Sequence, residues 1–296
     1  MLTAERPPHE PATPFPRLPD TLRSKYACDA LALRPFGISE DDLEVSFNGQ
    51  PRPHLITQVI AACTVGAGGG QPLEPDFFWS LPVGKRIECL LAIAVSGDGA
   101  EEIVIPLRCL EEACAQPLEL ELSLPEIVSL QNQTDEAERF TVRRGDEQLY
   151  VRRPTGSDQL AWLSARFADE AAAFGAMIGA LVSAQEAGAS DAADAAAVGA
   201  KIDGEWIGAI EEAMEEFDPL VNFSLSVRCP FCEAEHEHEI DLEELALRRL
   251  RQSQLRLLTS VHRLAKHYHW SEREIFSVPH RRRAFYLALI DREEDR

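Results

Sequence analysis

Two segments far apart in the chain repeat the same order of residue types around a pair of cysteines. Each has an apolar strand that ends in Arg-Cys, a short turn with a second cysteine, and an alternating acidic strand before a helix. The cysteines are Cys109 and Cys114 in the first segment and Cys229 and Cys232 in the second. Two thiolates on one tight turn supply half of the tetrahedron that Zn²⁺ prefers. We therefore expect the chain to fold back so that the two half-sites share one Zn²⁺.

Other interpretations of these cysteines remain open. Buried free thiols are common, because cysteine is among the most buried residue types. The Cys-Pro-Phe-Cys sequence is also compatible with a redox motif, although it lies between two predicted strands and not at the start of a helix. A local site made of Cys229, Cys232, His236 and His238 is a further alternative. Its two histidines fall on one strand face, but their short separation from Cys232 would strain closure around an ion.

Charge and composition exclude several classes of protein. The chain has 296 residues and a formal net charge of −21, which argues against a general nucleic-acid binder. No apolar segment approaches the roughly 20 residues that a membrane span needs, and the N-terminal residues include no apolar h-region, so we expect that the protein is not exported by a signal peptide. Seven cysteines, four of them in knuckle spacing, suit metal binding in a reducing compartment. We expect a cytoplasmic protein without a membrane span.

The pattern of apolar residues predicts an α+β fold, in which two zinc-ribbon-like β-ribbon halves pack with amphipathic helices and a helical tail follows. We divide the chain into four regions. They are a disordered Pro-rich arm over 1–20, an N-terminal α+β region over 21–139 with the first ribbon half, a helical region over 140–244 with the second half, and a basic helical tail over 245–296.

The C-terminal tail differs from the rest of the chain in charge. It holds twelve basic and six acidic residues, a net charge of +6 that leaves −27 for the remainder. Apolar residues at steps of three and four predict a long helix to Tyr268, and Ser271 with Glu274 forms a capping box for the next helix. Aromatic and arginine side chains dominate interface hot spots. We therefore predict a partner-binding face, made of Tyr268, Trp270, Arg281, Arg282, Phe285 and Tyr286.

The alternative interpretation of the tail is that its aromatic residues pack against one another within the helical hairpin. The histidines of this region, His262, His267 and His269, are predicted to pack at a helix end because no acidic partner is placed beside them. No Ser-His-Asp set and no phosphate-binding loop is visible, since the glycines of 66–70 are not followed by Gly-Lys-Ser/Thr. We therefore expect a protein that is not an enzyme and has no small-molecule substrate.

Two segments in the second half of the chain resemble segments of known protein families. The segment 262–287, with its Tyr-His-Trp-Ser-Glu core, resembles a helical hairpin in short proteins of contractile phage-tail and extracellular injection-system loci. The Arg-Pro-Thr-Gly-Ser-Asp sequence of 153–158 is similar to a segment of the base-plate protein family of contractile-tailed phages, and the Cys-Pro-x-Cys ribbon fits that family too. The resemblance implies a tail-assembly chaperone or minor baseplate component whose partners are baseplate or tail proteins.

Two other functions remain as alternatives. A cytoplasmic zinc-ribbon adaptor of another complex would use the same cysteines, and the acidic body argues against direct contact with nucleic acid. A Cys-x-x-Cys thiol oxidoreductase would need an exposed Cys229 with a depressed pKa.

Overall fold

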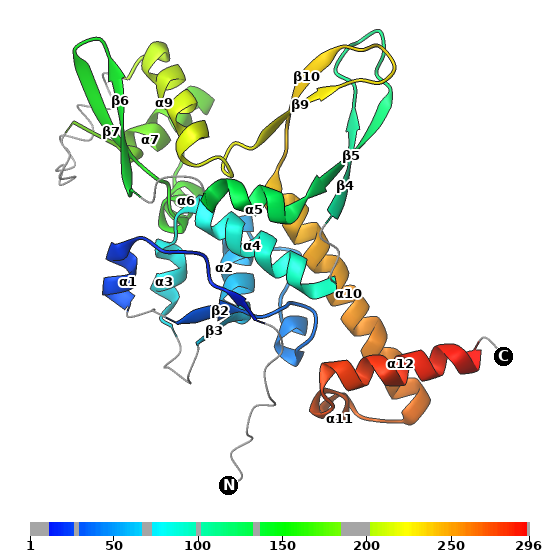
Figure 1. Ribbon diagram of the computed structural model, residues 1–296. Coiled ribbons are helices and arrows are strands. Elements are labelled where there is room, and N and C mark those ends of the chain that lie inside the picture. The colour runs from blue at the N-terminus through cyan, green and yellow to red at the C-terminus, as the bar shows by residue number, and fades with distance from the viewer. Residues whose placement is uncertain are drawn as a thin grey trace.

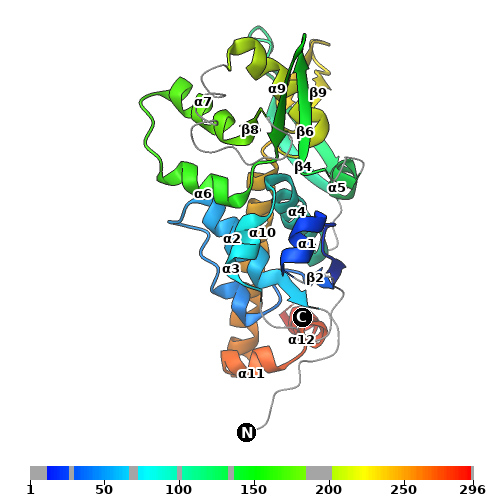
Figure 2. The ribbon, with the colours of Figure 1, turned by 90° about the vertical axis from the view of Figure 1, so that its left-hand side faces the viewer.

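The computed structural model describes residues 12–26, 30–66, 73–98, 102–132, 137–184 and 202–294. The fold is α+β, with small antiparallel sheets and helices of very different length. A central body carries two β-hairpins at one end and a pair of short helices at the other (Figure 1). The long helix α10 (Leu242–Tyr268) runs from the first end to the second (Figures 1 and 2).

The body is built around helix α4, whose sequence is apolar on most sides after the charged residues Lys85, Arg86 and Glu88 of its first two turns. Its residues Leu90, Leu91 and Ile93 are completely buried within the largest apolar cluster of the described chain. A helix that is apolar all round needs neighbours on every face, and α4 packs against α2, α5 and α10. The elements of the body are β1 (Thr13–Pro14), α1 (Asp20–Tyr26), β2 (Leu31–Leu33), the 3₁₀ helix η1 (Glu40–Leu43), α2 (Arg52–Cys63), β3 (Thr64–Gly66), α3 (Pro75–Ser80) and α4 (Val83–Asp98).

The predicted disordered arm over 1–20 is wrong from residue 12 onward, and residues 1–11 lie outside the described part of the chain. Thr13 and Pro14 form strand β1, which pairs with β2 in a sheet of order β1-β2-β3. Leu18 is buried in the main core, and Phe15 packs against Phe77 with ring centroids 6.0 Å apart. An edge strand tolerates proline. A high proline content therefore does not exclude a segment whose side chains pack in the core.

Two long hairpins rise from the body. The first joins β4 (Glu102–Arg108) to β5 (Pro117–Ser123) and leads into α5 (Leu124–Asn132). The second joins β9 (Ser224–Arg228) to β10 (Glu235–Glu239) and leads into α10. In the second strand of each hairpin, β5 and β10, exposed glutamates alternate with less exposed residues, as expected for a half-solvated antiparallel pair.

A second, smaller core lies beside the body. A hairpin forms from β6 (Arg139–Arg144) and β7 (Glu147–Arg152), and β8 (Val182–Ser183) pairs with β7. Helix α9 (Gly204–Phe217) covers the sheet with Trp206, Ile210 and Met214, which recur at helical spacing. The remaining helices of this part are α6 (Gly156–Ser164) and α7 (Glu170–Leu181).

The Arg-Pro-Thr-Gly-Ser-Asp segment joins the small core to the body. The N–H of Val83 donates to the carbonyl of Pro154, and the N–H of Gly156 donates to Leu81. A Cβ on Gly156 would lie 2.5 Å from a guanidinium nitrogen of Arg86, so only glycine fits this close approach. Thr155 caps α6, and the carboxylate of Asp158 accepts the N–H of Thr155 and two hydrogen bonds from Arg152. This motif therefore has a structural role.

The C-terminal end consists of α10, α11 (Glu272–Ser277) and α12 (His280–Glu294). The first half of α10 contributes Leu245, Leu247 and Leu250 to the body core, so the boundary predicted at 245 falls inside one packed unit. The second half packs with α11 and α12, and Ser271 with Glu274 forms the predicted capping box. No helix in the described ranges combines the length and apolar character of a membrane span.

Candidate metal centre

The loops at the tips of the two hairpins bring the four predicted cysteines together. The Sγ atoms of Cys109 and Cys232 are 3.6 Å apart, those of Cys114 and Cys229 are 3.8 Å apart, and all four lie within 4.8 Å of one another. Four sulfurs at the zinc–thiolate distance of about 2.3 Å would be separated by about 3.8 Å along each tetrahedron edge. Bonded sulfurs would be about 2.05 Å apart, so these cysteines are free.

The two loops use the same backbone turn although they differ in length. The N–H of Cys109 donates to the carbonyl of Gln116, and the N–H of Cys229 donates to Ala234. In each loop the acceptor is the second residue after the second cysteine. The residue between the second cysteine and this acceptor has a positive φ, which is 47° at Ala115 and 62° at Glu233. The two extra residues of the first loop lie between its cysteines, so they lengthen the turn without changing how it closes.

The surroundings of the cluster shift the pKa values of Cys229 and Cys109 in opposite directions. Burial would raise the pKa of Cys229, but the backbone N–H groups of Cys232 and Phe231, with the neighbouring thiols, lower it to about 7. Burial raises the pKa of Cys109 to about 12, and the other three thiols add to this effect. Four thiolates in contact repel one another, and the positive charge of a bound cation would offset that repulsion and so favour the deprotonated form of every ligand. The cluster is therefore suited to a divalent cation.

The surroundings of the cluster indicate a closed site. Cys109 and Cys229 are buried, Cys114 is half-buried and Cys232 is exposed. Leu118 is buried against them, with Leu107 and Val227 partly buried alongside. Four protein ligands leave no open coordination position, which is the arrangement of structural and not of catalytic zinc sites.

The alternative ligand sets are not brought together. Among the described residues, the four cysteines are the one group of three or more histidine, cysteine or carboxylate ligands with metal-binding spacing. His236 and His238 lie on β10 and pair in register with Val227 and Leu225 of β9. At the other end of α10, His267 lies 3.2 Å from a carboxylate oxygen of Glu293, so the prediction that it has no acidic partner is wrong.

The predicted partner-binding residues fall into two groups. Tyr268, Trp270 and Tyr286 pack on one another. The ring centroid of Trp270 lies 4.8 Å from that of Tyr268 and 5.1 Å from that of Tyr286. In contrast, Arg281, Arg282 and Phe285 point to solvent, and the Phe285 side chain is 72% exposed. The structure therefore brings the aromatic trio together within the hairpin and leaves the other three residues on its surface.

Sequence reasoning missed several buried charges. Lys85 and Glu88 form an ion pair of 2.9 Å inside the body. Asp218 is buried near Arg153, and burial raises its pKa. A Cβ on Gly84 would collide with its carboxylate. Lys85 and Glu88 belong to the same helix, whereas Asp218 meets Arg153 and Gly84 of distant elements, so no local pattern indicated its burial.

Comparisons with protein-family models, curated proteins and solved structures gave no match for this chain.

Proposed function

We propose that Cys109, Cys114, Cys229 and Cys232 hold one structural Zn²⁺, in the manner of a zinc ribbon whose halves come from two separate hairpins. The observation that supports this proposal is the spacing of the four sulfurs, close to the edges of a zinc–thiolate tetrahedron. The ion would connect two hairpins that otherwise meet through the few apolar side chains around the cysteines. Its role would be to fix the relative position of the two hairpin tips.

The proposed function is that of a non-enzymatic, zinc-stapled assembly factor or minor component of a phage-tail-like contractile baseplate. It would act in the cytoplasm through contacts with baseplate or tail proteins. Support for these partners comes from the sequence resemblance of 153–158 and 262–287 and from the basic tail on an acidic chain. A zinc-ribbon adaptor of another complex is the second candidate, which the same cysteine geometry favours. The oxidoreductase is disfavoured because Cys229, despite its lowered pKa, is buried among the other thiols.

Metal analysis of the purified protein tests the staple. We expect one tightly held zinc per chain by elemental analysis, and its loss in Cys229→Ser. Cys63→Ser is the matched control, because Cys63 is a free cysteine buried in the body core and far from the tips. A protein without zinc whose four cysteines react freely with a thiol reagent would show that the staple is wrong.

Co-expression with candidate tail proteins tests the partner. We expect Phe285→Asp, at an exposed position, to keep its zinc and fold while it no longer co-purifies with baseplate components. Leu163→Asp, an exposed apolar residue on α6, is the control. Normal assembly of tails with the Phe285 variant would argue against a partner face on α12.

A further inference from the structure

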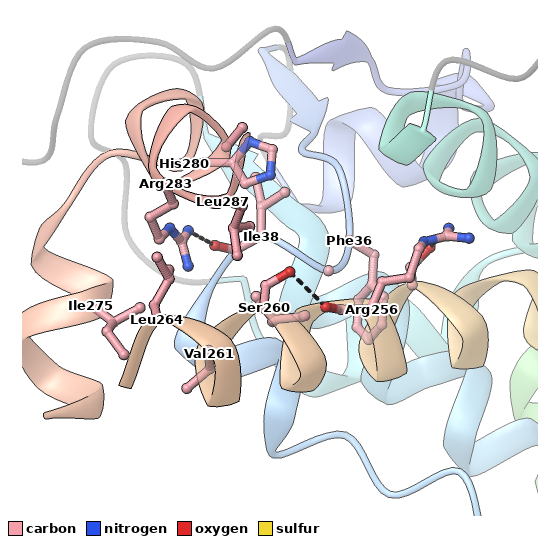
Figure 3. A pocket seen from close by; sticks show the side chains of 14 residues that line it. Phe36, Ile38, Arg256, Ser260, Val261, Leu264, Ile275, His280, Arg283 and Leu287 are labelled. Carbon is pink, nitrogen blue, oxygen red and sulfur yellow. Dashed lines mark hydrogen bonds between the residues drawn. The ribbon is translucent and has the colours of Figure 1, made fainter. Parts of the chain in front are cut away.

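One side of helix α12 is not covered by any described part of the chain. Its inner side packs on α10 and on the loop of residues 36–38, where Arg283 donates to the carbonyl of Ile38 and a small cavity lies beside Leu287 (Figure 3). At 3.6 residues per turn, five exposed residues of the other side span an arc of about 100°. We call this stripe the α12 face, and it consists of Arg281, Arg282, Phe285, Leu289 and Arg292.

The charges of α12 are sorted between these two sides. Asp291 and Glu294 pair with Arg263 of α10, and Glu293 lies 3.2 Å from His267 of the same helix. The acidic residues of α12 are therefore turned toward α10. In the described chain, by contrast, the three arginines of the α12 face have no ion pair. The face thus presents positive charge around exposed apolar side chains, an arrangement that often marks an interaction site.

The tips of the two cysteine hairpins present the opposite charge. Leu110 follows Cys109 and Phe231 precedes Cys232, and the sulfurs of these two cysteines are 3.6 Å apart, so both exposed apolar side chains lie at the same tip. Three exposed glutamates of the same loops complete what we call the tip patch, which consists of Leu110, Phe231, Glu111, Glu112 and Glu233. Glu233 pairs with Arg228 at 3.3 Å. The other two glutamates have no ion pair within the described ranges.

The exposure of apolar side chains singles out the same two surfaces. Phe285 is 72% exposed and Phe231 is 64% exposed, the two highest values among the large apolar side chains of the described residues. One belongs to the α12 face, where arginines surround it, and the other belongs to the tip patch, where glutamates surround it. Each surface therefore matches the other in apolar character and is opposite to it in charge.

The two surfaces do not meet within one chain, because they lie at opposite ends of α10, whose 27 residues span about 40 Å (Figure 1). Both project from the same side of the body, the right-hand side of Figure 1. A second copy placed on that side and turned by 180° would bring each tip patch to the α12 face of the other copy. Such closed pairs with a two-fold axis are the commonest protein oligomers.

We propose that two copies of this chain form an antiparallel dimer in which the tip patch of each copy binds the α12 face of the other. Copies with a net charge of −21 repel one another, so a stable contact has to join surfaces of opposite charge, as this one does. The dimer goes beyond the proposed function, whose partners are tail proteins, and requires only that the two hairpin tips stay together. A baseplate component that binds the α12 face would have to displace the second copy.

The mass of the purified full-length chain in solution tests the dimer. We expect sedimentation equilibrium of the zinc-loaded protein to give twice the mass of one chain. Phe231→Ser and Phe285→Ser should each shift this value toward the mass of one chain, because an exposed apolar anchor is lost from both contacts. Leu163→Ser, at an exposed apolar position of α6 outside both surfaces, is the matched control and should remain dimeric. A monomeric wild type, or equal masses for the three variants, would overturn the proposal.

An exchange of charges tests which surfaces meet. One variant carries Glu111→Arg with Glu112→Arg, and a second carries Arg281→Glu with Arg282→Glu. Each variant alone should be monomeric, because both of its contacts would join like charges. An equimolar mixture should form heterodimers, since one contact then keeps the native charges and the other has both signs reversed. Dimers of either variant alone, or monomers in the mixture, would contradict the antiparallel arrangement.

A charge control and zinc analysis separate this proposal from the metal staple. Glu211→Arg with Glu212→Arg makes an equal charge change at exposed positions of α9 and should leave the dimer and its zinc intact. A zinc-loaded monomer would overturn the dimer while the staple stands. A protein without zinc that dimerises with the same dependence on charge would support the dimer and refute the staple.

Discussion

The two regions that lie beyond the ends of helix α10 are stabilised by different means. At its N-terminal end, the cysteine arch consists of the β4–β5 and β9–β10 hairpins, and its tips enclose three buried residues, Cys109, Leu118 and Cys229. At its C-terminal end, the tail hairpin consists of the second half of α10 with α11 and α12. There Leu257, Val261, Leu264, Ile275 and Ile290 form an apolar core beside the aromatic trio.

This difference follows from geometry. A two-stranded hairpin that projects from a body has one face to bury and little to bury it against, and such units are marginal on their own. Three helices that cross one another enclose apolar side chains from several directions. The arch therefore depends on its cysteines for order at the tips, whereas the tail hairpin depends on packing. Perturbations should act on one end and spare the other.

The largest expected effect is that of metal removal on the arch. Structural zinc contributes about 10–16 kcal/mol in isolated zinc-finger peptides, and we expect a large part of the local stability of the tips to be lost on chelation or in Cys229→Ser. Hydrogen exchange provides the measurement, because the Cys109 and Cys229 amides donate to Gln116 and Ala234. Their protection should disappear while amides of the tail hairpin keep theirs. A uniform loss over the whole chain would contradict this separation.

The reverse perturbation is a cavity in the tail hairpin. Leu264 is fully buried, and Leu264→Ala should cost about 2–5 kcal/mol of local stability through lost transfer energy and unfilled space. Limited proteolysis should release fragments from α11 and α12, while the zinc content remains that of wild type. Leu258→Ala, at an exposed position on the same helix, serves as the control. Loss of zinc with Leu264→Ala would show that the two ends are coupled.

A smaller effect distinguishes the two interpretations of the aromatic residues. Trp270 contacts the rings of Tyr268 and Tyr286, so Trp270→Ala should lower the free energy of unfolding of the tail hairpin by about 1–3 kcal/mol for two aromatic pairs. Phe285→Ala should change it by less than about 0.5 kcal/mol, because the side chain is exposed. Chemical denaturation of both variants provides the measurement. Equal free energies of unfolding for the two variants would show that the aromatic pairs do not stabilise the tail hairpin.

The smallest effect is a dependence on pH at the start of α11. The backbone N–H and the hydroxyl of Ser271 donate to the carboxylate of Glu274 and lower its pKa in the folded state. A lowered folded pKa means that this contribution is present above the ordinary glutamate pKa and is lost as the pH falls through the folded value. The amide signal of Ser271, followed by NMR during acidification, should report this titration. Glu274→Gln should abolish it without affecting the arch.

The sequence predicted the elements whose information is local. The repeated strand–Cys–Cys–strand order predicted the quartet at Cys109, Cys114, Cys229 and Cys232, and helical spacing predicted the long helix α10. Features that need distant partners were not predictable in this way. The packing of Leu18, the burial of Asp218 beside Arg153 and the contact of Ile38 with Arg283 each depend on which segments meet in space.

The separation of the two cysteine pairs along the chain also has a consequence in time. Cys114 and Cys229 are 115 residues apart. At a synthesis rate of about 5–20 residues per second, the second cysteine pair is synthesised roughly 6–23 s after the first. During that interval, Cys109 and Cys114 exist as an exposed half-site, open to oxidation or to capture of a metal by the wrong thiols. We expect the yield of correctly loaded protein to depend on the redox state and zinc supply during synthesis.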